Sequence, residues 1–238
     1  MDDTGDTGKA TAPERATASQ GDHPLGPNAA AILATEHWSL LASRSLIWNE
    51  AQSRATVFLS VLSAATIALA LLADATGFGP QTTTVALVLL PIVLLLGIAA
   101  HSRLAEINRE EVELSLAMNR LRHAYLTIAP ALEPYFTTGH HDDEQGLAAS
   151  YLAGGVRLRR WGQFLVNTPT VVATVDAALA AAIVVVVVRA AQAAATVAVV
   201  AGAVAFLMVW AALMLLQRRA LDPLHRTTPR FPTPPDEP

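Results

Sequence analysis

One segment of the chain carries two patterns in direct succession: TTVALVLLPIVLLLGIAA at 83–100, then HSRLAEINREEVELSLAMNRLRHAYLTI at 101–128. The first pattern is a continuous apolar run, and a bilayer core about 30 Å thick is crossed by roughly 20 apolar helical residues. In the second pattern, apolar residues recur three and four positions apart with charged residues between them, which is typical of a solvated helix with one apolar stripe. We therefore expect one long helix that crosses a membrane and projects from it.

Three further apolar runs, at 55–73, 170–188 and 194–216, have similar lengths. Their apolar residues are consecutive, whereas the strands of a membrane β-barrel alternate apolar and polar residues. The composition agrees, because 53% of the 238 residues are hydrophobic and only 15% are charged, against about 25% in soluble domains. The sequence thus predicts an all-α fold with four transmembrane helices and excludes a soluble enzyme. The absence of cysteine excludes thiol nucleophiles and Cys-ligated metals.

The basic residues predict the orientation of these helices. All but one of the sixteen lysines and arginines lie before the first run, between the second and third, or after the fourth, and the exception is Arg189. Because cytoplasmic loops carry an excess of Lys and Arg, we expect both termini and residues 101–169 in the cytoplasm. The predicted organisation is a disordered arm at 1–29, a membrane domain with cytoplasmic helices at 30–221, and a Pro-rich disordered tail at 222–238 whose P-x-x-P spacings also suit a polyproline II ligand.

The apolar stripe after the second run defines a seam in which Glu111 alone interrupts the three-four spacing. A coiled-coil-like seam needs a partner, and two are open: the amphipathic segment at 31–54 of the same chain, or the seam of a second copy. Pro130 should end the helix near Ile128, because a proline disfavours helical backbone just before it. The seam residues are Leu104, Ile107, Leu114, Met118, Leu121, Tyr125 and Ile128.

Basic and aromatic residues cluster beside the cytoplasmic ends of the third and fourth runs. Each cation there contributes about 1 kcal/mol of attraction to anionic lipid, so we expect these residues to anchor the chain at the bilayer surface. They form no separate basic patch, and we expect no nucleic-acid partner. The anchoring residues are Arg157, Arg159, Arg160, Trp161, Arg218 and Arg219.

Asp176 is the only charged residue within the four apolar runs. It lies roughly 10 Å from the cytoplasmic end of its helix, where an acid is costly and must face protein or water. Ser60, Ser63 and Trp210 lie at matching depth on other runs, and we expect them to hydrogen-bond the carboxyl group. Two roles remain open: a packing contact, or an ion or proton relay in a small oligomeric channel or transporter. His101, at the membrane exit of the second run, is expected to be an interfacial anchor.

Five potential metal ligands follow one another at 140–144. Imidazole and carboxylate groups suit zinc, iron or manganese, so a divalent metal site, and with it a membrane metalloenzyme, is one hypothesis. Adjacent residues seldom all face one ion, and the alternative is a solvated loop in which an aspartate caps a helix that begins near Glu144. No other cofactor is indicated. The candidate ligands are His140, His141, Asp142, Asp143 and Glu144.

Three segments carry a resemblance to a known group of proteins: TEHWSLLASRSLIWNEAQSR at 35–54, MNRLRHAYLTIAPALEPYF at 118–136 and GHHDDE at 139–144. Together they resemble four-span bacterial integral membrane proteins, over about residues 30–217 and without either tail. The resemblance implies the four-span architecture and a place in the bacterial cytoplasmic membrane. It implies no activity, because none is attached to that group.

These patterns favour a non-enzymatic scaffold or regulatory membrane protein. Its cytoplasmic helices are expected to bind a second copy or a protein partner, and its apolar helices to bind the lipid bilayer. The channel or transporter around Asp176 is the first alternative, and the metalloenzyme at residues 140–144 is the second.

Overall fold

The computed structural model describes residues 26, 28–77, 79–152, 167–222 and 228–235. This part of the chain is all helical and contains no strand. Four of its helices are long and apolar enough to cross a membrane, which confirms the predicted all-helical class and its four candidate spans. The elements are α1 (Ala29–Thr76), α2 (Pro80–Ile128), the short 3-10 helix η1 (Pro130–Tyr135), α3 (Glu144–Leu152), α5 (Thr168–Ala190) and α6 (Ala195–Leu221).

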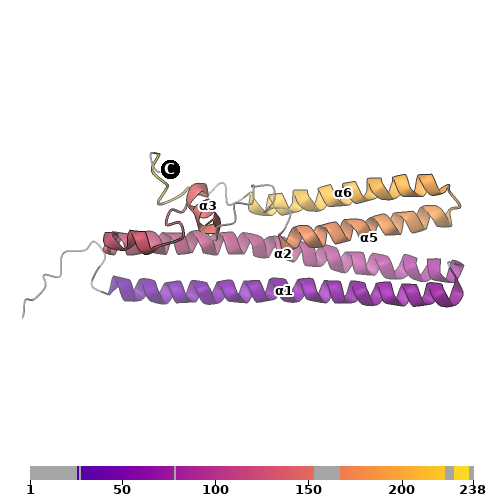
Figure 1. The fold of residues 1–238 in the computed structure, drawn as a ribbon, viewed down its shortest axis with the longest axis horizontal. Helices are drawn as coiled ribbons and strands as arrows, with labels where there is room; N and C mark the ends of the chain where they lie inside the picture. Colours follow the sequence, from indigo (N-terminus) through magenta and orange to yellow (C-terminus); the bar gives the residue numbers. More distant parts are fainter. Residues whose placement is uncertain (1–25, 27, 78, 153–166, 223–227, 236–238) are drawn as a thin grey trace, which may run out of the picture.

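Helices α1 and α2 form one very long antiparallel hairpin (Figure 1). They have 48 and 49 residues, so each is about 70 Å long, more than twice the hydrocarbon thickness of a bilayer. The chain turns between them at Gly77, whose φ of 68° is a conformation that glycine adopts readily. Helix α2 is continuous from the second apolar run into the polar segment and ends at Ile128, two residues before Pro130, as the sequence predicted.

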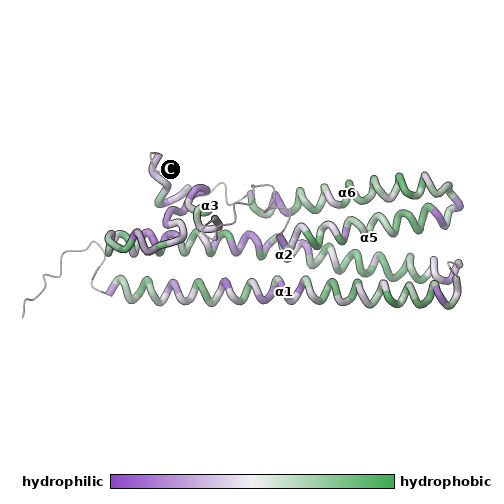
Figure 2. Tube along the Cα trace, viewed as in Figure 1, coloured by the Kyte–Doolittle hydropathy of each residue, from purple (hydrophilic) through white to green (hydrophobic). Residues whose placement is uncertain are grey.

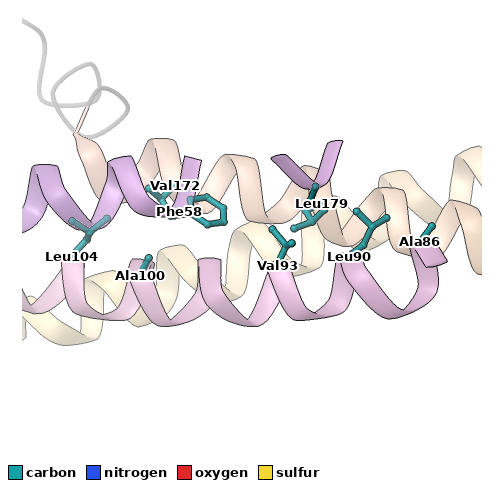
Figure 3. Close-up of a cluster of buried hydrophobic side chains, with 9 residues drawn as sticks. Phe58, Ala86, Leu90, Val93, Ala100, Leu104, Val172 and Leu179 are labelled. Carbon is teal, nitrogen blue, oxygen red and sulfur yellow. The ribbon is translucent and has the colours of Figure 1, made fainter. Parts of the chain in front are cut away.

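The hairpin has an apolar half near its turn and a polar half near its free ends (Figure 2). Helices α5 and α6 lie beside the apolar half, and α2 contacts α1, α5 and α6 there. The shared core includes Phe58 of α1, Val93 and Leu104 of α2, and Val172 and Leu179 of α5 (Figure 3). These five side chains join three helices into one bundle.

The outer faces of the apolar half remain uncovered. Val88 and Leu95 of α2 are 60% and 67% exposed, and Leu207 of α6 is 63% exposed. A soluble protein rarely leaves such large apolar surfaces in water. The distribution of apolar side chains therefore fits a bundle surrounded by lipid.

In the polar half, ion pairs join α1 to α2. Arg44 lies 2.9 Å from Glu111, the residue that interrupts the predicted seam. Arg103 donates two hydrogen bonds of 3.0 Å to Glu50, and those bonds, with one from Arg54, lower the pKa of Glu50 to about 2. Of the seam residues, Leu104, Ile107 and Met118 are buried within the chain, and Leu114, Leu121, Tyr125 and Ile128 are partly buried.

Candidate functional site

A loop between η1 and α3 is fixed to the polar half of α2. The side chain of Asn119, fully buried on α2, donates to the backbone carbonyl of His141 at 2.8 Å. Its amide oxygen accepts hydrogen bonds from Arg122 at 2.7 Å and from Ser150 of α3 at 2.8 Å. One buried amide therefore fixes both the loop and α3 in place.

Two glycines let this loop pack closely on α3. A Cβ atom at Gly139 would overlap the backbone carbonyl of Gly146, and one at Gly146 would overlap that of His141. Asp143 begins α3, because its side chain accepts from the backbone N–H of Gly146 at 2.8 Å. This contact confirms the alternative in which an aspartate caps a helix that begins near Glu144.

The end of the chain lies against this loop (Figure 1). Residues 229–235 read PRFPTPP, so only Arg230, Phe231 and Thr233 have a backbone N–H. All three donate to aspartates: Arg230 and Phe231 to Asp142, at 3.0 and 2.7 Å, and Thr233 to Asp143 at 2.6 Å. Two adjacent carboxylates thus bind every backbone donor of a proline-rich segment.

Further contacts hold Phe231. Its backbone carbonyl accepts from the N–H of Asp142 at 3.2 Å and lies 3.3 Å from Nδ1 of His141. Its ring stacks on the imidazole of His123 with the centroids 4.2 Å apart. A pocket of about 270 Å³ continues beyond the tail, lined by Thr233 and by loop residues that include His140. We call residues 139–146, with Asn119, Arg120 and His123, the docking site, and residues 228–235 the tail segment.

Asp142 is 4% exposed and ionised. Burial alone would raise the pKa of its carboxyl group, but the backbone N–H groups of Arg230 and Phe231 and the guanidinium of Arg120, at 2.6 Å, hold the pKa below its usual range. The pKa of Asp143 is likewise lowered against the effect of burial, by hydrogen bonds from Gly146 and Thr233. Burial and the charges of His141 and His140 lower the pKa of His123.

Acid should therefore release the tail segment in two stages. Burial lowers the pKa of His123, and the ring of Phe231 adds to that burial because it stacks on the imidazole; docking should therefore be strongest above the ordinary histidine value of 6.5 and weaken as the pH falls below it. The contributions of Asp142 and Asp143 are present above the ordinary aspartate value of 3.8 and are lost as the pH falls through their lowered pKa values. The chain has no cysteine, so spin labels at Glu113→Cys and Pro235→Cys can report the distance between α2 and the tail.

That distance should lengthen first between about pH 7 and pH 5, and again in more acidic solution. The variant His123→Phe keeps a ring for Phe231 to stack on but cannot be protonated, so it should lose the first stage alone. A tail that docks more tightly as the pH falls from 7 to 5 would contradict this assignment.

The structure does not assemble residues 140–144 as a metal site. The imidazoles of His123, His140 and His141 lie near one another, with His140 and His141 centroids 4.2 Å apart. Among the described residues, however, no group of three histidine or acidic side chains is arranged to hold a metal ion. Two of the proposed ligands, Asp142 and Asp143, accept hydrogen bonds from the tail segment instead.

The partners predicted for Asp176 are wrong. Ser60 and Ser63 are exposed on α1, because the helical turn that points Phe58 inward directs both hydroxyls outward. The indole N–H of Trp210 donates to Thr174 at 3.3 Å. Asp176 instead lies against α2, over Gly97, where a Cβ atom would overlap its carboxylate.

Of the predicted lipid anchors, Arg218 and Arg219 are exposed in the last turn of α6, where basic side chains also complement the helix dipole. The four anchors at Arg157, Arg159, Arg160 and Trp161 lie outside the described residues. Sequence reasoning missed the site residues Asn119, Arg120 and Phe231. It also left the tail segment without a contact, whereas residues 228–235 have a defined place on the docking site.

The docking site is suited to recognition of a peptide. Its acceptors are ionised carboxylates, its aromatic contact with the tail segment is a ring stack, and its bound segment is irregular and rich in proline. The chain matches no known family model, no curated protein and no solved structure.

Proposed function

We propose that this protein is a non-enzymatic membrane scaffold whose docking site binds a proline-rich peptide, its own tail segment in cis and a partner's or second copy's segment in trans. One observation carries the proposal: Asp142 and Asp143 together accept all three backbone N–H groups that residues 229–235 possess. The spacing of these donors is set by proline, so the site recognises a pattern of missing and present N–H groups.

The docking site is preformed by contacts that do not involve the tail segment. Asn119 ties α2 to the loop and to α3, and Arg120 neutralises the buried Asp142. Binding costs the peptide little conformational entropy, because its prolines already restrict the backbone of the unbound chain. Such preorganisation on both sides favours binding by a short segment.

The membrane setting is part of the proposal. We infer that the four apolar helices lie in the bacterial cytoplasmic membrane, with both termini and the polar halves of α1 and α2 in the cytoplasm. The excess of basic residues on that side and the four candidate spans support this orientation. The seam residues of α2 then pack against α1 as a coiled-coil-like cytoplasmic extension, supported by the Arg44–Glu111 pair. The docking site is carried on this extension.

A tail variant tests the function in the full-length chain. Phe231→Pro with Thr233→Pro removes two of the three backbone donors, so the tail should leave the docking site open. A fluorescent peptide of sequence TPRFPTPP, residues 228–235, should then bind in the micromolar to millimolar range by fluorescence anisotropy. The unaltered chain should bind it far more weakly, because its own tail competes at an effective concentration of about millimolar.

Two matched controls distinguish specific from non-specific binding of the peptide. The peptide TPRPPPPP, with the two substitutions placed in the ligand instead, should not bind the tail variant. Adding Asp142→Asn to the tail variant should also abolish binding. Equal binding of the two peptides, or no binding of TPRFPTPP at millimolar concentration, would exclude the docking site as a peptide receptor.

A further inference from the structure

A cavity of about 380 Å³ lies between α1 and α2, away from the docking site. Its lining residues fall between Glu50 and Phe58 on α1 and between Leu96 and Ala100 on α2. The apolar run of α1 begins at residue 55 and that of α2 ends at residue 100, so the cavity spans the boundary between the polar and apolar halves of the hairpin (Figure 2). Its volume lies within the range of about 300–1,000 Å³ that is usual for small-molecule sites.

The part of the cavity in the apolar half is lined by side chains without polar atoms. Phe58 and Ala100 are buried at its base (Figure 3). Val57 and Leu96, at its edge, are 54% and 37% exposed. Ala99 and Ala100 carry only a methyl group each, which leaves space between the two helices. This part of the cavity therefore suits a hydrocarbon chain.

The part of the cavity in the polar half has one acid and one base, a helical turn apart on α1. Nε of Arg54 donates to Oε1 of Glu50 at 2.9 Å, and Arg103 of α2 donates to both oxygens of Glu50 at 3.0 Å. Within the described part of the chain, the terminal NH₂ groups of Arg54 have no acceptor. Oε2 of Glu50 accepts one hydrogen bond there and has a second lone pair. The cavity thus offers cationic donors beside an anionic acceptor.

The length of the cavity indicates what kind of molecule fits it. Glu50 and Phe58 are eight residues apart, or about 12 Å along the helix axis. The polar layer on each side of a bilayer is only about 5–8 Å thick. In the proposed membrane setting, the cavity reaches from this layer into the hydrocarbon. A ligand that fills it needs a polar head group and an apolar chain, as a phospholipid has.

The surrounding charges narrow the class of head group. The ion-paired groups at this end of the cavity contain one more acid than base: Glu50, Arg54, Arg103, Glu106 and Glu110. A lipid with a net negative charge would add to that excess, whereas a phosphate joined to an ammonium group adds no net charge. A primary ammonium also has three N–H donors, and a quaternary ammonium has none. The pair of opposite charges in the cavity therefore complements a head group of the phosphoethanolamine type.

We propose that this cavity binds one phosphatidylethanolamine molecule. Arg54 donates to the phosphate, Glu50 accepts from the ammonium group, and an acyl chain lies against Phe58. The proposal rests on the proposed membrane setting, but it is independent of peptide docking, which is measured at another site with another ligand. Failure of one therefore leaves the other standing.

Native mass spectrometry of the full-length protein, delipidated in detergent and titrated with single lipids, tests the head group. Phosphatidylethanolamine should bind about 3- to 10-fold more tightly than phosphatidylcholine with the same acyl chains, because only the former donates hydrogen bonds to Glu50. Glu50→Gln should remove this preference, and Glu106→Gln, at another acid paired with Arg103, should keep it. Equal binding of the two lipids by the unaltered chain would overturn the proposal, as would tighter binding of phosphatidylglycerol.

A second variant locates the lipid without touching a charged residue. Ala99→Leu fills the apolar part of the cavity from an exposed position, so the chain should fold and should lose the preference for phosphatidylethanolamine. Ala211→Leu enlarges an exposed alanine of α6 outside the cavity and should retain it. A preference that survives in Ala99→Leu would place the lipid elsewhere. Displacement of the lipid by an equal concentration of phosphoethanolamine would show that the ligand is a soluble molecule instead.

Discussion

Gly97→Leu should destroy the cooperative packing of the membrane bundle. Gly97 lies where α1, α2 and α5 meet, and even a single added carbon would overlap the carboxylate of Asp176 and press on the ring of Phe58. Overpacking of a core costs about 1–3 kcal/mol and sometimes more, and here it also displaces a buried acid. Leucine favours a helix over glycine by less than about 1 kcal/mol, which is too little to offset this.

The measurement is unfolding by SDS in mixed micelles, followed by tryptophan fluorescence and circular dichroism. We expect Gly97→Leu to lose its cooperative transition while keeping most of its helix. Gly97→Ala should lose less stability than Gly97→Leu. Adding Asp176→Ala to Gly97→Ala should restore part of that stability, because it removes the overlap with the carboxylate and leaves only the overlap with Phe58. Ala99→Leu, an enlargement at an exposed position of the same helix, should change stability by less than about 0.5 kcal/mol. If Gly97→Leu unfolded with the same cooperative transition as the unaltered protein, the close packing of the three helices at Gly97 would be refuted.

Asp142→Asn should release the tail segment although it changes only one atom of the side chain. An asparagine offers one oxygen where the aspartate offers two, and its NH₂ group must face the N–H of Arg230, the N–H of Phe231 or the guanidinium of Arg120. Hydrogen bonds to a charged group contribute about 1.5–3 kcal/mol each, so losing one of the two bonds from the tail to Asp142 should weaken docking roughly 10- to 100-fold.

Hydrogen exchange at the amides of Arg230, Phe231 and Thr233 measures this release. All three should exchange much faster in Asp142→Asn, together with a longer distance between spin labels on α2 and the tail. Glu106→Gln, at an exposed acid of α2 that pairs with Arg103, should leave exchange in the tail segment unaltered. Protection that survives in Asp142→Asn would show that the carboxylates are not what holds the tail.

The sequence predicted those parts of the fold that depend on local pattern. Four apolar runs of the length of a bilayer gave the four long helices, and Pro130 gave the end of α2. Both signals act within a few residues, so no knowledge of tertiary contacts was needed. Asp143 as the cap of α3 belongs to the same class.

The docking site escaped prediction because its two parts are about 90 residues apart in the chain. The composition of the tail indicated disorder, and the acids at 142 and 143 suggested a metal, since neither segment alone shows its partner. The N–H pattern of PRFPTPP was the available signal: a segment with so few donors can be satisfied by two carboxylates. For the position of Asp176 the signal was Gly97, because a glycine within an apolar run lets a side chain of another helix approach the backbone closely.

The length of the α1–α2 hairpin has a consequence for which molecules can use the docking site. In the proposed membrane setting, about twenty residues separate the membrane end of α2 near Ala100 from Asn119 and Arg120, which places the docking site roughly 30 Å above the bilayer. Two paired helices joined by Arg44–Glu111 and Glu50–Arg103 act as a strut of fixed height. A partner embedded in the same membrane must present its peptide at that height before the peptide can compete with the tail segment. The hairpin should therefore select partners by the reach of their extramembrane segments as well as by sequence.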